Sequence, residues 1–173
     1  SNTDLSCSPA KLTQNLESLL DQLGQGLASR KLKIATAESC TGGLLSFALA
    51  SDPAVSPNLD RGFIVYSPDA KSEQLGLSLS QIDRCDGVSA AVAKAMADGA
   101  LVKSQADIAV AVTGFAGPQE ESEEVGLVYL AVAMRGKKTF LRTCRFGDVG
   151  RLSVCQQAAE EALEMLVSAT QQN

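Results

Sequence analysis

Three short polar turns hold the residues of this sequence that could carry out chemistry, and each of them follows an apolar run. The first turn holds Ser39, the second holds Tyr66 and Lys71, and the third runs from Thr113 to Pro118. A hydroxyl and an amine are groups that enzymes use as nucleophile and general base, and a phenol can assist in proton transfer. If the fold brings the turns together, they form a site for chemistry.

Ser39 is the candidate nucleophile, because it lies where an apolar run ends and a helical pattern begins. Directly after it come Thr41, Gly42 and Gly43. Glycines let a backbone approach a ligand closely, and the first-turn amides of a helix are free donors near its positive dipole end. An oxyanion formed by attack of this hydroxyl would lie near those donors. The structural alternative is that Ser39 or Thr41 only caps the helix.

The candidate base is a lysine, because the sequence contains no histidine. That absence excludes a Ser-His-Asp triad or a Cys-His dyad within this chain. Lysine can replace imidazole if partial burial lowers its pKa. Lys71 is the best placed, since it follows a predicted strand end that also holds Tyr66. The structural alternatives are a solvated helix residue for Lys71 and a core-edge aromatic for Tyr66.

The third turn combines the hydroxyl of Thr113 with two glycines, Gly114 and Gly117. It could cradle a phosphate or a planar ring, although it is neither a Walker loop nor a G-x-G-x-x-G motif. The acidic stretch that follows, residues 119–124, is interpreted as a solvated loop. It would also suit a cation, but it lacks the EF-hand pattern and its glycine.

Composition places these turns in a single α/β domain. The chain has 173 residues, 45% of them apolar, and we expect residues 1–10 to be a flexible N-terminal segment. Its 15 basic residues are outnumbered by 20 acidic ones and form no run, which argues against a nucleic-acid partner. Five cysteines without a C-x-x-C spacing favour reduced thiols in the cytoplasm and argue against a zinc site. There is no long apolar run, so we expect no membrane partner.

Apolar periodicity predicts an alternation of helices and strands. The expected helices are residues 12–28, 44–50, 69–75, 90–103 and 151–170, and the expected strands are 34–37, 61–66, 108–112, 126–134 and 139–146. The last two strands are joined as a hairpin. This order predicts a mixed, mostly parallel five-stranded sheet with helices on both faces. Ligands of such sheets bind beyond the carboxyl ends of parallel strands, where the three polar turns fall.

Taken together, the turns resemble the C-terminal domain of the competence-damage-inducible CinA family, over almost the whole chain. The matching segments are residues 36–43, 61–67, 70–71, 75–76, 87–89, 92–93, 96–97, 99–100 and 106–118. The resemblance implies a three-layer α/β/α sandwich and an enzyme, a metal-independent C–N hydrolase that needs no cofactor. Its implied substrate is a pyridine nucleotide, nicotinamide mononucleotide, whose carboxamide would yield nicotinic acid mononucleotide and ammonia. A homo-oligomer is a further expectation.

The resemblance also implies roles for individual residues. Ser39 corresponds to the nucleophile and Lys71 to the base, with Tyr66 positioning or relaying the proton. The residues that we predict to bind the substrate are Thr41, Gly42, Gly43, Thr113, Gly114, Gly117 and Arg151.

The chain departs from the family pattern at two places. Residues 119–124 replace a glycine-rich run, with Glu123 where the family commonly has lysine, and Val149 and Ser153 take the places of two arginines. Arg151 partly substitutes for them. All these changes make the site more negative, so we hypothesise that the Ser39–Lys71 chemistry survives while affinity for a phosphorylated nucleotide is reduced or lost.

Two alternatives follow from these departures. One is a diverged paralogue with reduced or no deamidase activity, acting as a nucleotide-binding or interaction module. The other is an amidase for an uncharged or cationic substrate, for which the acidic residues 119–124 would be useful.

Overall fold

A computed structural model describes residues 12–28 and 30–171, so the expected flexible segment 1–10 lies outside the described residues. Within them the chain forms one five-stranded sheet in the order β2-β1-β3-β4-β5. The strands are β1 (Ile34–Glu38), β2 (Leu59–Ile64), β3 (Ile108–Gly114), β4 (Leu127–Met134) and β5 (Phe140–Arg145).

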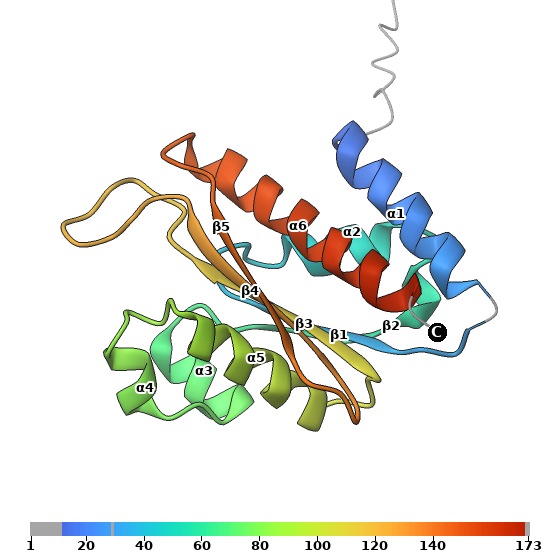
Figure 1. Ribbon diagram of the computed structural model, residues 1–173, viewed down its shortest axis with the longest axis horizontal. Helices are drawn as coiled ribbons and strands as arrows, with labels where there is room; N and C mark the ends of the chain where they lie inside the picture. The colour runs from blue at the N-terminus through green and yellow to red at the C-terminus, as the bar shows by residue number, and fades with distance from the viewer. Residues whose placement is uncertain (1–11, 29, 172–173) are drawn as a thin grey trace, which may run out of the picture.

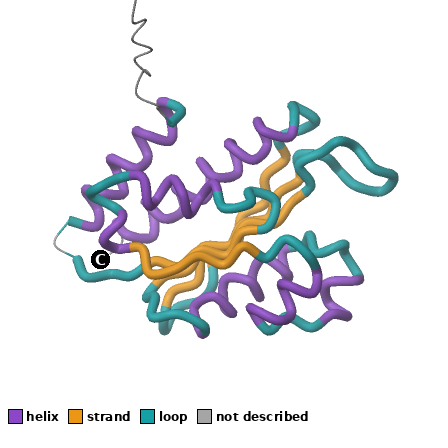
Figure 2. The backbone as a smooth tube through the Cα atoms, turned by 180° about the vertical axis from the view of Figure 1, so that it is seen from behind, coloured by secondary structure: helices purple, strands orange, loops and turns teal. Residues whose placement is uncertain are grey.

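Helices cover both faces of the sheet, which confirms the three-layer α/β/α architecture (Figure 1). One face carries α1 (Gln14–Leu27), α2 (Leu44–Ser51) and α6 (Arg151–Gln171), and the other carries α3 (Pro68–Leu75), α4 (Leu79–Asp83) and α5 (Ala90–Val102). Figure 2 shows the same layers from behind, with the sheet between the two groups of helices.

The two faces of the sheet differ because side chains alternate along each strand. On the side of α1 and α6, the strands contribute bulky residues such as Ile34, Val112 and Leu130. On the side of α5 they contribute alanines, including Ala37 and Ala111. Small side chains on the strands and on the alanine-rich α5 allow that helix to pack close to the sheet.

The expectation of a mostly parallel sheet holds only in part, because the sheet is mixed. β1 pairs in parallel with β2 and β3, whereas β3–β4 and β4–β5 are antiparallel. The predicted hairpin of the last two strands is confirmed. Helix α4 and a 3₁₀ turn at Ser56–Asn58 were not predicted, and both are shorter than the periodicity analysis resolves.

The second strand begins and ends earlier than the sequence pattern predicts. β2 covers Leu59–Ile64, so Tyr66 lies in the loop after it. The ladder nevertheless continues by one bond, since Val65 N donates to Glu38 O at 2.8 Å. Ser67 then caps α3 by accepting from Ala70 N at 3.1 Å. The loop is therefore short and fixed at both ends, which positions the start of α3.

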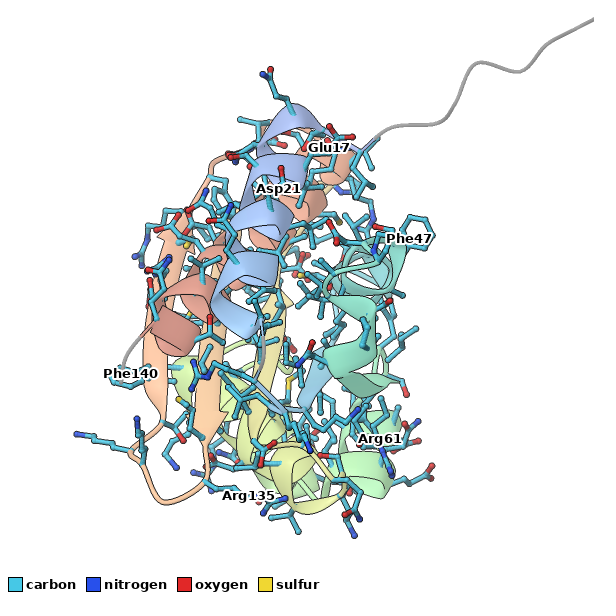
Figure 3. All side chains as sticks on the ribbon, turned by 90° about the vertical axis from the view of Figure 1, so that its right-hand side faces the viewer. Glu17, Asp21, Phe47, Arg61, Arg135 and Phe140 are labelled. Carbon is cyan, nitrogen blue, oxygen red and sulfur yellow. The ribbon has the colours of Figure 1, made fainter. Side chains whose placement is uncertain are left out.

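The outer surface follows the amphipathic pattern of the helices. Figure 3 shows Glu17 and Asp21 on the exposed side of α1, and Phe47 on α2 and Phe140 on β5 pointing away from the core. In the part of the chain that the structure describes, no helix combines the length and the apolar character needed to span a bilayer.

Candidate active site

The polar turns meet at one edge of the sheet, where the parallel neighbours β1 and β3 have their carboxyl ends. A cavity of about 260 Å³ opens there. The sequence-predicted site residues that line it are Ser39, Tyr66, Lys71, Thr113, Gly114, Gly117 and Arg151. The fold thus brings together seven of the ten residues from four separate segments of the chain.

Ser39 and Lys71 are in direct contact at this cavity. Lys71 Nζ lies 3.0 Å from Ser39 Oγ, and it also donates to Val65 O at 3.1 Å and Tyr66 O at 3.3 Å. A protonated amine would donate to all three oxygens. A neutral amine would donate to the two carbonyls and present its lone pair to the serine hydroxyl. The geometry therefore accommodates the neutral form, which a general base requires.

Burial changes the acidity of Lys71. The side chain is only 3% exposed, and this desolvation lowers its pKa from the ordinary value. The nearby Cys40 and Cys85 act in the opposite direction and only weaken the effect. Among residues 12–28 and 30–171, no carboxylate forms an ion pair with Lys71 to hold it charged.

Ser39 is held by the sheet and by the turn that it begins. Its N–H donates to Val112 O at 3.0 Å, which continues the β1–β3 ladder, and its carbonyl accepts from Gly42 N at 3.0 Å. The N–H groups of Cys40 and Thr41 donate no hydrogen bond to any other described residue. They lie in the turn before α2, which begins at Leu44, and an oxyanion on a Ser39-bound intermediate could form near them. The first-turn amides of α2, which the sequence predicted for this role, are already engaged, since Leu45 N and Ser46 N donate to Glu38.

Glu38 fixes this turn, although it was not predicted as a site residue. Its carboxylate is fully buried and accepts from Thr41 Oγ1 at 2.7 Å and from Leu45 N and Ser46 N at 2.9 Å each. The Ser46 hydroxyl donates to it as well. A carboxylate at the end of a buried strand, just before a helix, is the signal that could have identified it, since such a group suits the helix N-terminus.

Thr41, Gly42 and Gly43 have structural contacts and are not among the residues that line the cavity. Thr41 donates its hydroxyl to Glu38. Gly42 and Gly43 have φ values of 58° and 108°, which favour glycine, and Gly43 is the N-cap of α2. The alternative that Ser39 or Thr41 caps this helix is therefore wrong. That these three residues bind substrate stays a prediction.

Thr113 and Gly114 line the cavity and also hold it together. Thr113 is fully buried and donates its hydroxyl to Gly87 O at 2.7 Å. This contact brings the segment before α5, including Asp86, to the cavity wall. Gly114 has no room for a side chain, because a Cβ there would lie 2.7 Å from Leu127 O.

Tyr66 and Arg151 form the outer wall of the cavity. The Tyr66 side chain is exposed, and its hydroxyl accepts a hydrogen bond from Arg151. Arg151 also donates to Gly117 O, so it ties the loop after β2 to the loop after β3. The contact between Tyr66 and Lys71 is through the Tyr66 carbonyl. Proton relay by the phenol stays a prediction.

Two groups of cavity residues were not predicted as site residues. Asp86, Gly87 and Val88 come from the segment before α5, and Glu120 and Glu123 come from the acidic stretch that the sequence analysis interpreted as a solvated loop.

Cys40 also lines the cavity, where it is buried. Burial, together with Cys155 nearby, raises its pKa to about 12. The thiolate is therefore disfavoured, and the side chain packs in the apolar core. Among the described residues, no group of three or more His, Cys, Asp or Glu side chains is arranged to hold a metal ion.

Comparisons with known proteins agree with this architecture. A nicotinamide-nucleotide amidohydrolase, PncC, from Escherichia coli K12 is 40% identical over 154 residues, covering 87% of this chain and 92% of that protein. A CinA-like protein from Chlorobium limicola is 40% identical over 148 residues, covering 83% of this chain and 34% of that protein. The chain likewise spans only 36% and 28% of the length of other curated relatives.

Solved structures show the same fold. The competence/damage inducible protein CihA from Agrobacterium tumefaciens has a TM-score of 0.89 and 38% identity, and the match covers 95% of this chain and all of that one. The model of the CinA C-terminal domain family matches residues 16–170. This chain therefore belongs to the CinA C-terminal domain family.

Proposed function

We propose that this protein hydrolyses the carboxamide of nicotinamide mononucleotide, giving nicotinic acid mononucleotide and ammonia. The observation that carries the proposal is the 3.0 Å hydrogen bond between Lys71 Nζ and Ser39 Oγ at the wall of a cavity. The Escherichia coli relative, a nicotinamide-nucleotide amidohydrolase that is similar over most of both chains, supports the choice of substrate class.

In the first half of the proposed reaction, Ser39 Oγ attacks the carboxamide carbon while its proton moves to Lys71 Nζ. The developing oxyanion is stabilised by the N–H groups of Cys40 and Thr41, which have no other protein acceptor among the described residues. The C–N bond then breaks, Lys71 returns the proton to the leaving nitrogen, and ammonia departs. An ester between the nicotinoyl group and Ser39 remains.

In the second half, water attacks the ester carbon and Lys71 again accepts a proton. The tetrahedral intermediate collapses, the bond to Ser39 Oγ breaks, and the serine recovers its proton from Lys71. The products are the carboxylic acid and the free enzyme. The two carbonyls that accept from Lys71 Nζ keep the amine aimed at Ser39 through both proton transfers.

The test is the release of ammonia from nicotinamide mononucleotide by the wild-type protein and by Ser39→Ala. We expect the variant to lose at least about a thousandfold in kcat, since it lacks the nucleophile. Ser80→Ala, at an exposed position on α4, is the matched control and should keep full activity. Full activity of Ser39→Ala with an unchanged unfolding curve would exclude this mechanism.

A nucleotide-binding module without turnover remains the alternative, and the same proteins separate it from the enzyme. The three carboxylates at the cavity, those of Asp86, Glu120 and Glu123, favour this alternative if they prevent productive binding of the phosphate. The alternative predicts no ammonia from wild type and a measurable dissociation constant for a pyridine nucleotide in a calorimetric titration.

A further inference from the structure

The wall of the cavity that holds Ser39 and Lys71 carries an excess of negative charge. Its acidic residues are Asp86 and Glu120, which are exposed, and Glu123, which is half-buried. None of the three forms an ion pair within residues 12–28 and 30–171, whereas the adjacent Glu124 is paired with Arg145 at 3.1 Å. Their charges therefore remain available to act on a ligand.

The positive charges of the cavity are already engaged. Lys71 must be neutral to serve as the base, which leaves Arg151 as the one cation of the described lining. The guanidinium of Arg151 donates to the Tyr66 hydroxyl and to Gly117 O. Three carboxylates against Arg151 alone leave the cavity with a net charge of about −2, which repels a phosphate dianion and attracts a cation.

The geometry limits where the charge of a substrate can lie. The carboxamide carbon must reach Ser39 Oγ, so the rest of the molecule occupies the remaining cavity and its mouth. The volume of about 260 Å³ is below the usual range for small-molecule sites, roughly 300–1,000 Å³. A ligand that fills it lies against a wall to which Asp86, Glu120 and Glu123 all contribute. An N-ribosylated nicotinamide has a positive ring nitrogen, and without phosphate this is its only charge.

We infer that this site prefers a dephosphorylated pyridinium nucleoside carboxamide over the corresponding mononucleotide, with Asp86, Glu120 and Glu123 as the residues that set the preference. The inference rests on the proposed carboxamide hydrolysis at Ser39 and narrows its substrate class. The reaction is otherwise unchanged: the amide C–N bond is hydrolysed, ammonia leaves, and the acid remains on the pyridinium nucleoside.

The test compares nicotinamide riboside with nicotinamide mononucleotide as substrates. For wild type we expect kcat/KM to be about tenfold higher for the riboside, because solvent screens the charges at the cavity mouth but leaves a net repulsion of the phosphate. In the double variant Glu120→Gln/Glu123→Gln this ratio should fall severalfold, mainly through a lower KM for the mononucleotide. Raising the salt concentration should also lower the ratio of kcat/KM for the riboside to kcat/KM for the mononucleotide in wild type.

The matched control is Glu121→Gln, which removes an exposed carboxylate of the same loop that does not line the cavity. It should leave the ratio unchanged. A higher kcat/KM for the mononucleotide in wild type, or the same ratio in wild type and the double variant, would overturn the inference while leaving the proposed hydrolysis in place.

Failure of the proposed hydrolysis has a different signature, which is no ammonia from either compound. In that case the inference is tested by calorimetric titration of the same proteins, which compares the dissociation constants of the riboside and the mononucleotide. Tighter binding of the riboside supports it. Tighter binding of the mononucleotide, or binding of neither compound, contradicts it.

Discussion

The turn after β1 and the loop after β3 leave the same edge of the sheet, but they are held in opposite ways. In the turn, the buried carboxylate of Glu38 accepts from the backbone and side chains around it, and the Ser39 N–H is tied to Val112 O. The loop of residues 118–124 extends away from the sheet (Figure 1) and carries mostly exposed side chains. Its contacts are largely internal, such as Glu123 N to Glu120 O at 3.0 Å.

This difference indicates that the two regions serve different functions at one cavity. Reacting groups must be held within a fraction of an ångström, and a turn fixed by a buried carboxylate provides that. Recognition of the outer part of a substrate tolerates change, and an exposed loop can acquire new charges at little cost in stability. The acidic residues within 119–124 would then alter substrate choice without disturbing the contact between Ser39 and Lys71.

The largest expected effect concerns the rigid side of this comparison. Lys71→Arg places a guanidinium, which stays protonated, where a neutral amine is required, so kcat should fall by about a thousandfold or more. Lys137→Met, at an exposed position in the β4–β5 turn, is the control. A Lys71→Arg variant with substantial activity would show that Lys71 is not the base.

If Lys71 is the base, it should also set the pH dependence of wild-type activity. Activity should rise with pH as Lys71 loses its proton, and burial places this rise below the ordinary lysine pKa of about 10.4. At a pH between the lowered pKa and that ordinary value, Lys71 is protonated in the unfolded state and neutral in the folded state. The unfolded state therefore binds more protons than the folded state, so the free energy of unfolding should also rise with pH. Product formation followed by chromatography, with a thermal unfolding curve at each pH, measures both. A rise centred at or above the ordinary value would contradict the role of burial.

The next largest effect should come from Glu38, which joins the two ends of the Ser39 turn. In Glu38→Gln the amide NH₂ would face donors that the carboxylate now satisfies, such as Leu45 N or Ser46 N. The free energy of unfolding should fall by about 2–3 kcal/mol, and kcat should fall by about ten- to a hundredfold as Ser39 shifts.

Urea denaturation and ammonia release measure the two consequences of Glu38→Gln. Glu121→Gln, which makes the same change on the exposed loop, should stay within about 0.5 kcal/mol of wild type. Equal stabilities of the two variants would remove the contrast between the fixed turn and the free loop.

The helices and strands, and Ser39 and Lys71 as candidate site residues, were predictable because they depend on local patterns. Apolar periodicity located every long helix and every strand of the described residues, and Ser39 and Lys71 each come shortly after an apolar run, Ser39 in a turn and Lys71 near the start of α3. The lysine could be selected because the absence of histidine removes the commonest base.

The rest of the site depends on contacts between distant segments, which local patterns do not encode. Asp86 reaches the cavity because its neighbour Gly87 accepts a hydrogen bond from Thr113, 26 positions along the chain. Glu123 lines the cavity only because of the path that the loop takes after β3. Glu38 ends a buried strand, and its role follows only from the hydrogen bonds that its carboxylate accepts from Leu45 N and Ser46 N.

The smallest expected effect is that of Tyr66→Phe, at the boundary between the fixed and the free region. Its hydroxyl contacts Arg151, whereas Lys71 is held by the Tyr66 carbonyl, which the substitution retains. We therefore expect kcat to fall by less than about tenfold. If the hydroxyl acts only by holding Arg151, the double variant Tyr66→Phe/Arg151→Ala should have the same kcat/KM as Arg151→Ala alone. A different result would assign the phenol a proton-transfer role: kcat falls a hundredfold or more in Tyr66→Phe, and the double variant shows the full effects of both substitutions multiplied together. The region that must be held fixed for catalysis would then extend to the exposed wall of the cavity.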